Sequence, residues 1–211
     1  MSDFTDYQDG DLYFLPLGGS GEYGANLNLY QYNGQWLMVD LGVAFAGEEM
    51  AGVELLVPDP TYIERQRHRL TGLIITHAHE DHIGGVAHLW KRLRCPIYIT
   101  RFAAAFLHAH LQEHDDDEKP DIRIIEPGTW FDLGPFACRL VGITHSTPES
   151  CMVEIVTPAG RVVHTGDWKL DKDPLVGDAY DAALYNEIGN NGVLACISES
   201  TNATVPGSSL S

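Results

Sequence analysis

The sequence has no long apolar run. No segment of its 211 residues approaches the roughly 20 apolar residues that a membrane-spanning helix needs. Residues 1–6 are acidic and show no basic and apolar signal pattern. There is also no internal repeat and no low-complexity segment. We therefore expect a cytoplasmic protein with no membrane partner.

Cysteine and positive charge are both scarce. The four cysteines lie far apart and form no C-x-x-C pair, so we expect them to be reduced and mostly buried. The chain has 13 Lys and Arg against 30 Asp and Glu, a formal net charge of −17. A protein that held nucleic acid by overall charge would be basic. A polyanionic substrate must then be held by metal ions and a local basic patch, or by protein outside this sequence.

The length fits a single domain with a substantial core, spanning residues 1–211. Its pattern interleaves helices and strands, which indicates a layered α/β architecture with mixed sheets rather than one parallel sheet. The predicted helices are residues 60–68, 83–93, 101–114 and 178–188. The predicted strands are residues 12–17, 26–32, 35–40, 73–76, 96–100, 122–125, 129–133, 136–143, 151–157, 161–163 and 192–198.

A glycine-rich segment follows the first predicted strand. Residues 19–24 fit G-x-G-x-x-G, and Asp40 lies at nearly the distance expected of a ribose-binding acid. The dinucleotide fingerprint needs a helix after the glycines, but here a hairpin follows, with Asn33-Gly34 as its turn. A hairpin cannot supply the helix N-terminus that would hold a pyrophosphate. The pattern therefore argues against a dinucleotide site.

The most informative segment is residues 76–85, which contains H-x-H-x-D-H directly after an apolar run. In an extended segment His77 and His79 point to one side, while Asp81 and His82 can turn toward a second centre. Imidazole nitrogen and carboxylate oxygen are ligands that suit a catalytic zinc. The alternative, a histidine-rich surface turn, gives little reason for the apolar lead-in or for the Gly-Gly pair that follows.

Two further segments can complete such a site. His145 comes just after an apolar strand, as His77 does, and Asp167 lies in a glycine-containing turn at another strand end. Strand ends gathered at one sheet edge are where α/β folds place their sites. Alone, each residue would be an ordinary loop residue, but H-x-H-x-D-H requires partners downstream.

These motifs together resemble the metallo-β-lactamase fold, and within it the β-CASP nucleases of the ribonuclease J family. The resemblance rests on residues 17–26, 39–42, 76–85, 144–146, 164–167 and 198–202. The histidine motif alone would fit any hydrolase of this fold. Combined with the glycine-rich start and the segment Ser-Glu-Ser-Thr-Asn, it is much more specific. The resemblance implies an αβ/βα sandwich that is incomplete at its C-terminus.

The same resemblance implies two zinc ions per active site in the complete enzyme. One would be held by His77, His79 and His145, a second by Asp81 and His82, and Asp167 would bridge them. The acid Asp40 would orient the ligand loop, and His164 would be a hydrogen-bond partner of Asp167 or only a strand residue. The catalytic set would be Asp81, His82, Asp167 and Glu199, where Glu199 assists protonation of the leaving group. Many ribonuclease J sequences carry Asp at that last place, which leaves its role less defined.

The implied activity is zinc-dependent hydrolysis of single-stranded RNA, as a 5′-3′ exonuclease, an endonuclease or both, in RNA maturation and decay. RNA would be the partner, and the full-length enzyme would be a homo-oligomer, a dimer or a tetramer. Family members continue through an inserted β-CASP domain and then return to finish the first domain. We expect both parts after residue 211, with the histidine that completes the second zinc site.

Two other functions fit parts of the pattern. A small-molecule hydrolase of the same fold, such as a thioesterase, lactonase or β-lactamase, fits the histidine motif but not the Ser-Glu-Ser-Thr-Asn segment. An inactive scaffold subunit of a nuclease is the non-enzymatic alternative, although the ligand set through Asp167 is intact. The pair His110 and His114 is interpreted as a solvated helix end, and His68 and His88 as surface residues.

Overall fold

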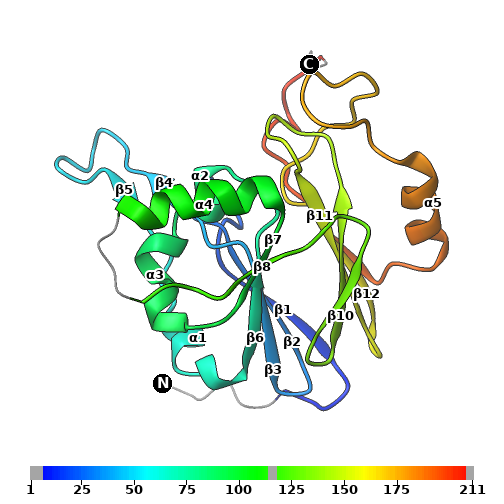
Figure 1. Cartoon of the computed structure of the whole chain (residues 1–211), viewed down its shortest axis with the longest axis horizontal. Helices are drawn as coiled ribbons and strands as arrows, with labels where there is room; N and C mark the ends of the chain where they lie inside the picture. The colour runs from blue at the N-terminus through cyan, green and yellow to red at the C-terminus, as the bar shows by residue number, and fades with distance from the viewer. Residues whose placement is uncertain (1–6, 114–117, 208–211) are drawn as a thin grey trace.

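A computed structural model describes residues 7–113 and 118–207. Two β-sheets pack face to face, with helices on both outer faces (Figure 1). The helices α1, α3 and α4 cover the outer face of the first sheet, and α5 covers the outer face of the second. The expected αβ/βα sandwich with mixed sheets is therefore confirmed. None of the helices in the described ranges is long and apolar enough to cross a membrane.

The first sheet has six strands in the order β1-β2-β3-β6-β7-β8. Neighbours are antiparallel from β1 to β3 and parallel from β3 to β8. The hairpin between β2 and β3 turns at Asn33 and Gly34, whose φ angles are both positive, as the turn signal predicted. The strands are β1 (Leu12–Gly18), β2 (Leu27–Tyr32), β3 (Gln35–Val39), β6 (Leu70–Ile74), β7 (Ile97–Ile99) and β8 (Ile122–Ile124).

The second sheet has five strands in the order β13-β12-β11-β10-β9. All neighbours are antiparallel except β12 and β13, which are parallel. A separate two-stranded hairpin of β4 (Ala44–Phe45) and β5 (Leu55–Leu56) was not predicted. The strands are β9 (Trp130–Leu133), β10 (Phe136–Gly142), β11 (Cys151–Thr157), β12 (Gly160–His164) and β13 (Ala195–Ile197).

The helices depart more from the predictions than the strands do. The helix predicted over residues 60–68 is one turn of α-helix followed by a 3₁₀ turn. The helix predicted over residues 83–93 begins only at residue 86, because Ile83 ends a separate short helix and Gly84-Gly85 lie between the two. Helix α5 begins later than predicted because Asp181 caps it, accepting bonds from the amides of Ala183 and Leu184. The helices are α1 (Thr61–Glu64), η1 (Arg67–Arg69), α2 (Glu80–Ile83), α3 (Val86–Leu93), α4 (Arg101–Glu113) and α5 (Ala182–Asn190).

The central strands of the first sheet, β2, β3, β6 and β7, are buried on both faces. Along β3, Trp36 and Met38 pack under the helices, while Leu37 and Val39 pack against the second sheet. Side chains of a strand alternate between faces, so each strand contributes to two cores. The core between the sheets includes Phe136, which is fully buried. This packing fixes the positions of the strand ends.

The C-terminal ends of β3, β6, β10, β12 and β13 meet at one edge of the sandwich. Strands β3 and β6 are parallel, and so are β12 and β13, while β10 and β12 are both antiparallel to β11. A hydrogen bond from the amide of Cys151 to the carbonyl of Thr76, at 3.0 Å, joins the two sheets at this edge. The loops that leave these strands therefore converge.

The loop after β3 holds the H-x-H-x-D-H segment through its backbone. The amides of Leu41 and Val43 donate to the carbonyls of His82 and Glu80, at 2.8 and 3.0 Å. Gly42 lies between them, and a Cβ there would be 1.6 Å from the carbonyl oxygen of Asp81. Only glycine permits so close an approach of the two backbones.

We predict that Gly42→Ala lowers the free energy of unfolding by about 3 kcal/mol, because the new methyl group must push the ligand loop away. Gly142→Ala is the matched control, since nothing lies within 4 Å of a Cβ there and its φ is not positive. Urea unfolding of both variants measures the difference. Equal effects at the two glycines would contradict this account of the loop.

Candidate metal centre

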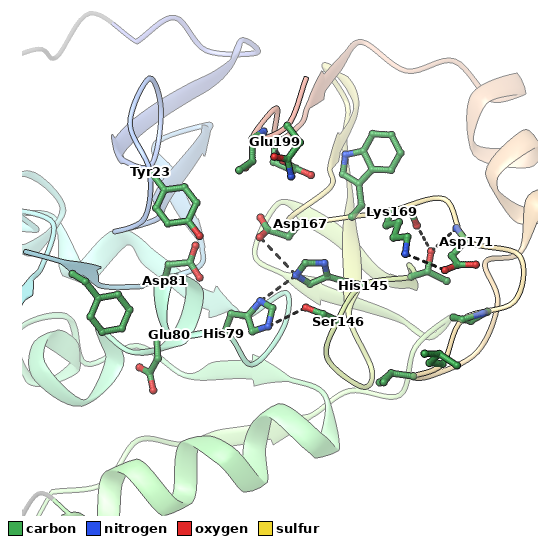
Figure 2. Close-up of a pocket in the computed structure, with 18 residues that line it drawn as sticks. Tyr23, His79, Glu80, Asp81, His145, Ser146, Asp167, Lys169, Asp171 and Glu199 are labelled. Atoms are coloured by element: carbon green, nitrogen blue, oxygen red, sulfur yellow. Dashed lines mark hydrogen bonds and ion pairs between the residues drawn. The ribbon is translucent and has the colours of Figure 1, made fainter. Parts of the chain in front are cut away.

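Three histidines and one aspartate converge where the two sheets meet. Figure 2 shows His79, His145 and Asp167 of this group. The Nδ1 atom of His79 lies 3.1 Å from the Nε2 atom of His77 and 3.1 Å from the Nε2 atom of His145. The Oδ2 atom of Asp167 is 3.7 Å from the same nitrogen of His145. These residues come from the loops after β6, β10 and β12. Segments almost 90 residues apart in the sequence thus form one group.

The spacing of these atoms fits a tetrahedral metal ion. With zinc–nitrogen distances of about 2.0–2.1 Å, neighbouring ligand nitrogens in a tetrahedral site lie about 3.3 Å apart. The two separations of 3.1 Å are close to that value. Each of the three imidazoles directs a ring nitrogen at the same point, and a cation at that point could bind all three. The donor set therefore suits a metal.

The protonation of the three histidines agrees with this. Burial lowers the pKa of His77, of His79 and of His145, and the neighbouring imidazoles lower the pKa of His77 further. A lowered pKa keeps an imidazole neutral, and the neutral ring is the form that binds a metal. His77 is also almost fully buried, with 1% of its surface exposed.

Asp81, His82 and Asp167 form a second group beside the first. The Nε2 atom of His82 is 3.5 Å from the Oδ2 atom of Asp81 and 3.2 Å from the Oδ1 atom of Asp167. Burial raises the pKa of Asp81. Burial also opposes ionisation of Asp167, but the hydrogen bond to His82 and the charges of the neighbouring imidazoles together outweigh it and lower the pKa of Asp167. Asp167 thus directs one carboxylate oxygen at each group.

The buried carboxylate of Asp40 orients the ligand loop. It accepts hydrogen bonds from the amide and the hydroxyl of Thr76, at 2.8 and 2.9 Å. Its Oδ2 atom also lies 2.7 Å from the Nδ1 atom of His82. Burial opposes a charge on His82, but Asp40 and Asp167 outweigh it and raise its pKa to about 10. With Nδ1 bound to Asp40, the opposite nitrogen of His82 must face the second group.

Glu199 lies at the cleft in front of both groups (Figure 2). It follows β13, and its Oε2 atom accepts a hydrogen bond from the amide of Thr201, at 2.8 Å. The neighbouring Ser198 accepts a bond from the indole of Trp168, which ties this segment to the Asp167 loop. The cleft has a volume of about 800 Å³, which is ample for a nucleotide-sized group.

Of the two alternatives for His164, a partner of Asp167 or only a strand residue, the structure agrees with the second, since His164 ends β12. Its Nδ1 atom is 2.8 Å from the hydroxyl of Tyr30, a residue of β2 on the facing sheet, and no bond to Asp167 is present. Full burial lowers the pKa of His164 to about 4. The side chain therefore stays neutral and links the two sheets behind the site.

Sequence reasoning gave no separate role to two residues that hold the site together. The side-chain Nδ2 atom of Asn26 donates to the carbonyl of Asp81 at 3.0 Å and lies 3.2 Å from the Nε2 atom of His82. The hydroxyl of Thr76 contacts both Asp40 and His77. The only feature of the sequence that points to these two residues is their position. Asn26 ends the glycine-rich segment, and Thr76 begins the histidine motif.

Among the residues that the structure describes, the remaining histidines belong to neither group. His68 and His88 are exposed, as predicted. His110 is partly exposed, and its Nε2 atom is 3.2 Å from Glu80, whereas His114 lies outside the described residues. The glycine-rich segment leads directly into the β2–β3 hairpin rather than a helix, as the turn signal predicted.

The chain belongs to the metallo-beta-lactamase superfamily, because the model of that family matches residues 20–189. Its sequence is similar to curated ribonucleases J. The protein of that name from Sinorhizobium meliloti is 46% identical over 200 residues, which cover 93% of this chain and 36% of that protein. The one from Synechocystis is 40% identical over 198 residues, covering 93% of this chain and 31% of that protein.

Solved structures agree on the fold. The metallo-beta-lactamase fold protein YhfI from Bacillus subtilis matches with a TM-score of 0.53 at 17% identity, covering 74% of this chain and 62% of that one. A likeness at this identity shows the fold alone. The chain spans about a third of the length of the two ribonucleases J that it matches.

We predict that Asp40→Asn lowers the zinc affinity of the second group, which contains His82, 10- to 100-fold. The reason is that the amide of asparagine cannot accept all three hydrogen bonds that fix Thr76 and His82. The step that depends on the three histidines should change little. Competition with a zinc-binding dye measures both steps, and the exposed Asp132→Asn is the control. Unchanged affinity at the second group would mean that Asp40 does not orient the site.

Proposed function

We propose that the chain carries the metal-binding part of a zinc-dependent ribonuclease that hydrolyses phosphodiester bonds in single-stranded RNA. The observation that carries this proposal is the shared carboxylate of Asp167, which faces two adjacent ligand groups. Paired metal groups suit the displacement at phosphorus that diester hydrolysis requires. Similarity to two ribonucleases J over 93% of the chain supports RNA as the substrate class.

The chain's own residues would perform distinct tasks. One zinc would be held by His77, His79 and His145. A second would be held by Asp81 and His82, and Asp167 would be a ligand of both. Zinc ions bound there would supply Lewis acidity, lower the pKa of water and neutralise charge on the phosphate. Asp40 would fix His82, and Asn26 would fix the backbone at Asp81.

Glu199 would hold or deliver a proton at the leaving oxygen. Its side chain lines the cleft with Asp81 and Asp167, and a carboxyl group within reach of the departing oxygen can act as a general acid. A histidine partner from a further segment is part of the same proposal.

The proposal places this activity in a longer protein, with a β-CASP insertion and the last ligand histidine supplied by further segments. The longer relatives support this, as does the exposed edge strand β13. A cytoplasmic location is part of the proposal, supported by four free cysteines, three of them buried. Homo-oligomerisation of the longer protein stays a prediction, as does the choice between exonuclease and endonuclease action.

We predict that the 211-residue chain binds nearer one zinc than two. The first group offers three imidazoles and a carboxylate, while the second has one imidazole and shares Asp167. Metal analysis of protein dialysed against excess zinc gives the stoichiometry. Zero zinc after such dialysis would contradict the ligand assignment, and His79→Ala should remove the tightly bound ion.

We also predict that Asp81→Ala abolishes RNA cleavage by the longer enzyme, because it removes a metal ligand at the exposed end of the site and no core contact. Turnover of 5′-monophosphorylated RNA is measured beside thermal melting. The exposed Glu113→Ala is the control and should keep full activity. Near-normal cleavage by Asp81→Ala would reject the two-metal assignment.

A further inference from the structure

A basic patch lies at the end of the sandwich opposite the metal centre. Residues of η1 directly precede β6, and residues at the end of α3 precede β7, so the patch adjoins the N-terminal ends of two parallel strands (Figure 1). The C-terminal end of β6 leads into the metal loop. The two segments are in contact, since a guanidinium nitrogen of Arg67 is 3.4 Å from the carbonyl oxygen of Arg92. The patch consists of Arg65, Arg67, Arg69, Lys91, Arg92 and Arg94.

This patch concentrates charge that is scarce elsewhere. It holds six of the 13 Lys and Arg in a chain with 30 Asp and Glu. Arg65, Arg67 and Arg69 are exposed, and none of them forms an ion pair within residues 7–113 and 118–207. Arg92 pairs with Glu64, and Arg94 with Glu118. The three arginines of the α1–η1 segment therefore present positive charge that no ion pair neutralises, although the carboxylates of Asp59 and Glu64 lie near Arg65 and Arg67.

The cleft at the metal centre has the opposite character. Lys169 is the only Lys or Arg among the residues described as lining it, and its ammonium is 3.2 Å from Asp171. Asp81, Asp167 and Glu199 line the same cleft. Beyond any bound metal, the cleft offers little attraction for the phosphates of a strand, so charge-driven affinity within this chain comes from another face.

We propose that the basic patch binds the phosphate backbone of single-stranded RNA outside the cleft. This inference rests on the proposed function for the identity of the polymer. Guanidinium groups match phosphate oxygens with paired donors, and Arg67 and Arg69 lie in one short turn with exposed side chains. The five residues of β6 span about 17 Å between the patch and the metal loop. Only an RNA longer than a few nucleotides reaches both.

The test uses the 211-residue chain in the presence of a chelator, so that cleavage does not consume the probe. Fluorescence anisotropy follows binding of a labelled oligouridylate of about 20 nucleotides over a range of salt concentrations. The patch variant is Arg67→Gln/Arg69→Gln. The control is Arg101→Gln/Arg123→Gln, which removes the same charge from two exposed arginines already paired with Glu126 and Asp121.

The patch variant should bind about tenfold more weakly at low salt, and the slope of log affinity against log salt should fall by about 1.4, or about 0.7 for each lost phosphate contact. The control should keep the affinity and slope of the unchanged chain. No binding by the unchanged chain, or an equal loss in the control, would overturn the inference. So would a patch variant that alters self-association by sedimentation but not RNA binding, because the patch would then serve a second copy.

These outcomes are separable from those for the proposed function. Patch-dependent RNA binding without cleavage by the longer enzyme would leave this inference standing and reject the ribonuclease. If cleavage depends on Asp81 but RNA binding is the same with and without the patch arginines, the ribonuclease proposal stands and this inference is rejected.

Discussion

The buried carboxylate of Asp40 is the interaction on which the site depends. It joins the end of β3 to the end of β6 through Thr76 and fixes the ring of His82. Asp40 itself adopts a φ of 63°, a left-handed conformation that costs a non-glycine residue free energy. Three hydrogen bonds to a fully buried carboxylate offset that cost, and they also satisfy a group that could not stay buried alone.

The two-sheet core gives this arrangement its rigidity. Each ligand loop leaves a strand whose side chains pack in the core, and the bond between Thr76 and Cys151 ties the sheets at the point where the loops meet. The ligand positions are thus set by the same packing that stabilises the fold. By contrast, the cleft rim includes the exposed Tyr23 and Phe45, which such packing does not restrain.

Much of this could be predicted from the sequence because its signals were local. The Asn33-Gly34 turn fixed the β2–β3 hairpin, and H-x-H-x-D-H after an apolar run located the ligand loop. The structure brings all six expected metal ligands together. The features that sequence reasoning missed depend on distant contacts. A Cβ at Gly85 would lie 2.6 Å from the carbonyl oxygen of Gly42, and no local rule reveals that contact.

The shared carboxylate of Asp167 makes the two ligand groups thermodynamically interdependent. A cation at either group would restrict the side chain to the rotamer that also suits the other, so the entropy of ordering it is lost only once. Linkage then requires that each ion raise the affinity for its neighbour, apart from their mutual repulsion. A chain with one ion would therefore already hold this carboxylate in place for another, a gain that opposes the repulsion between the two cations.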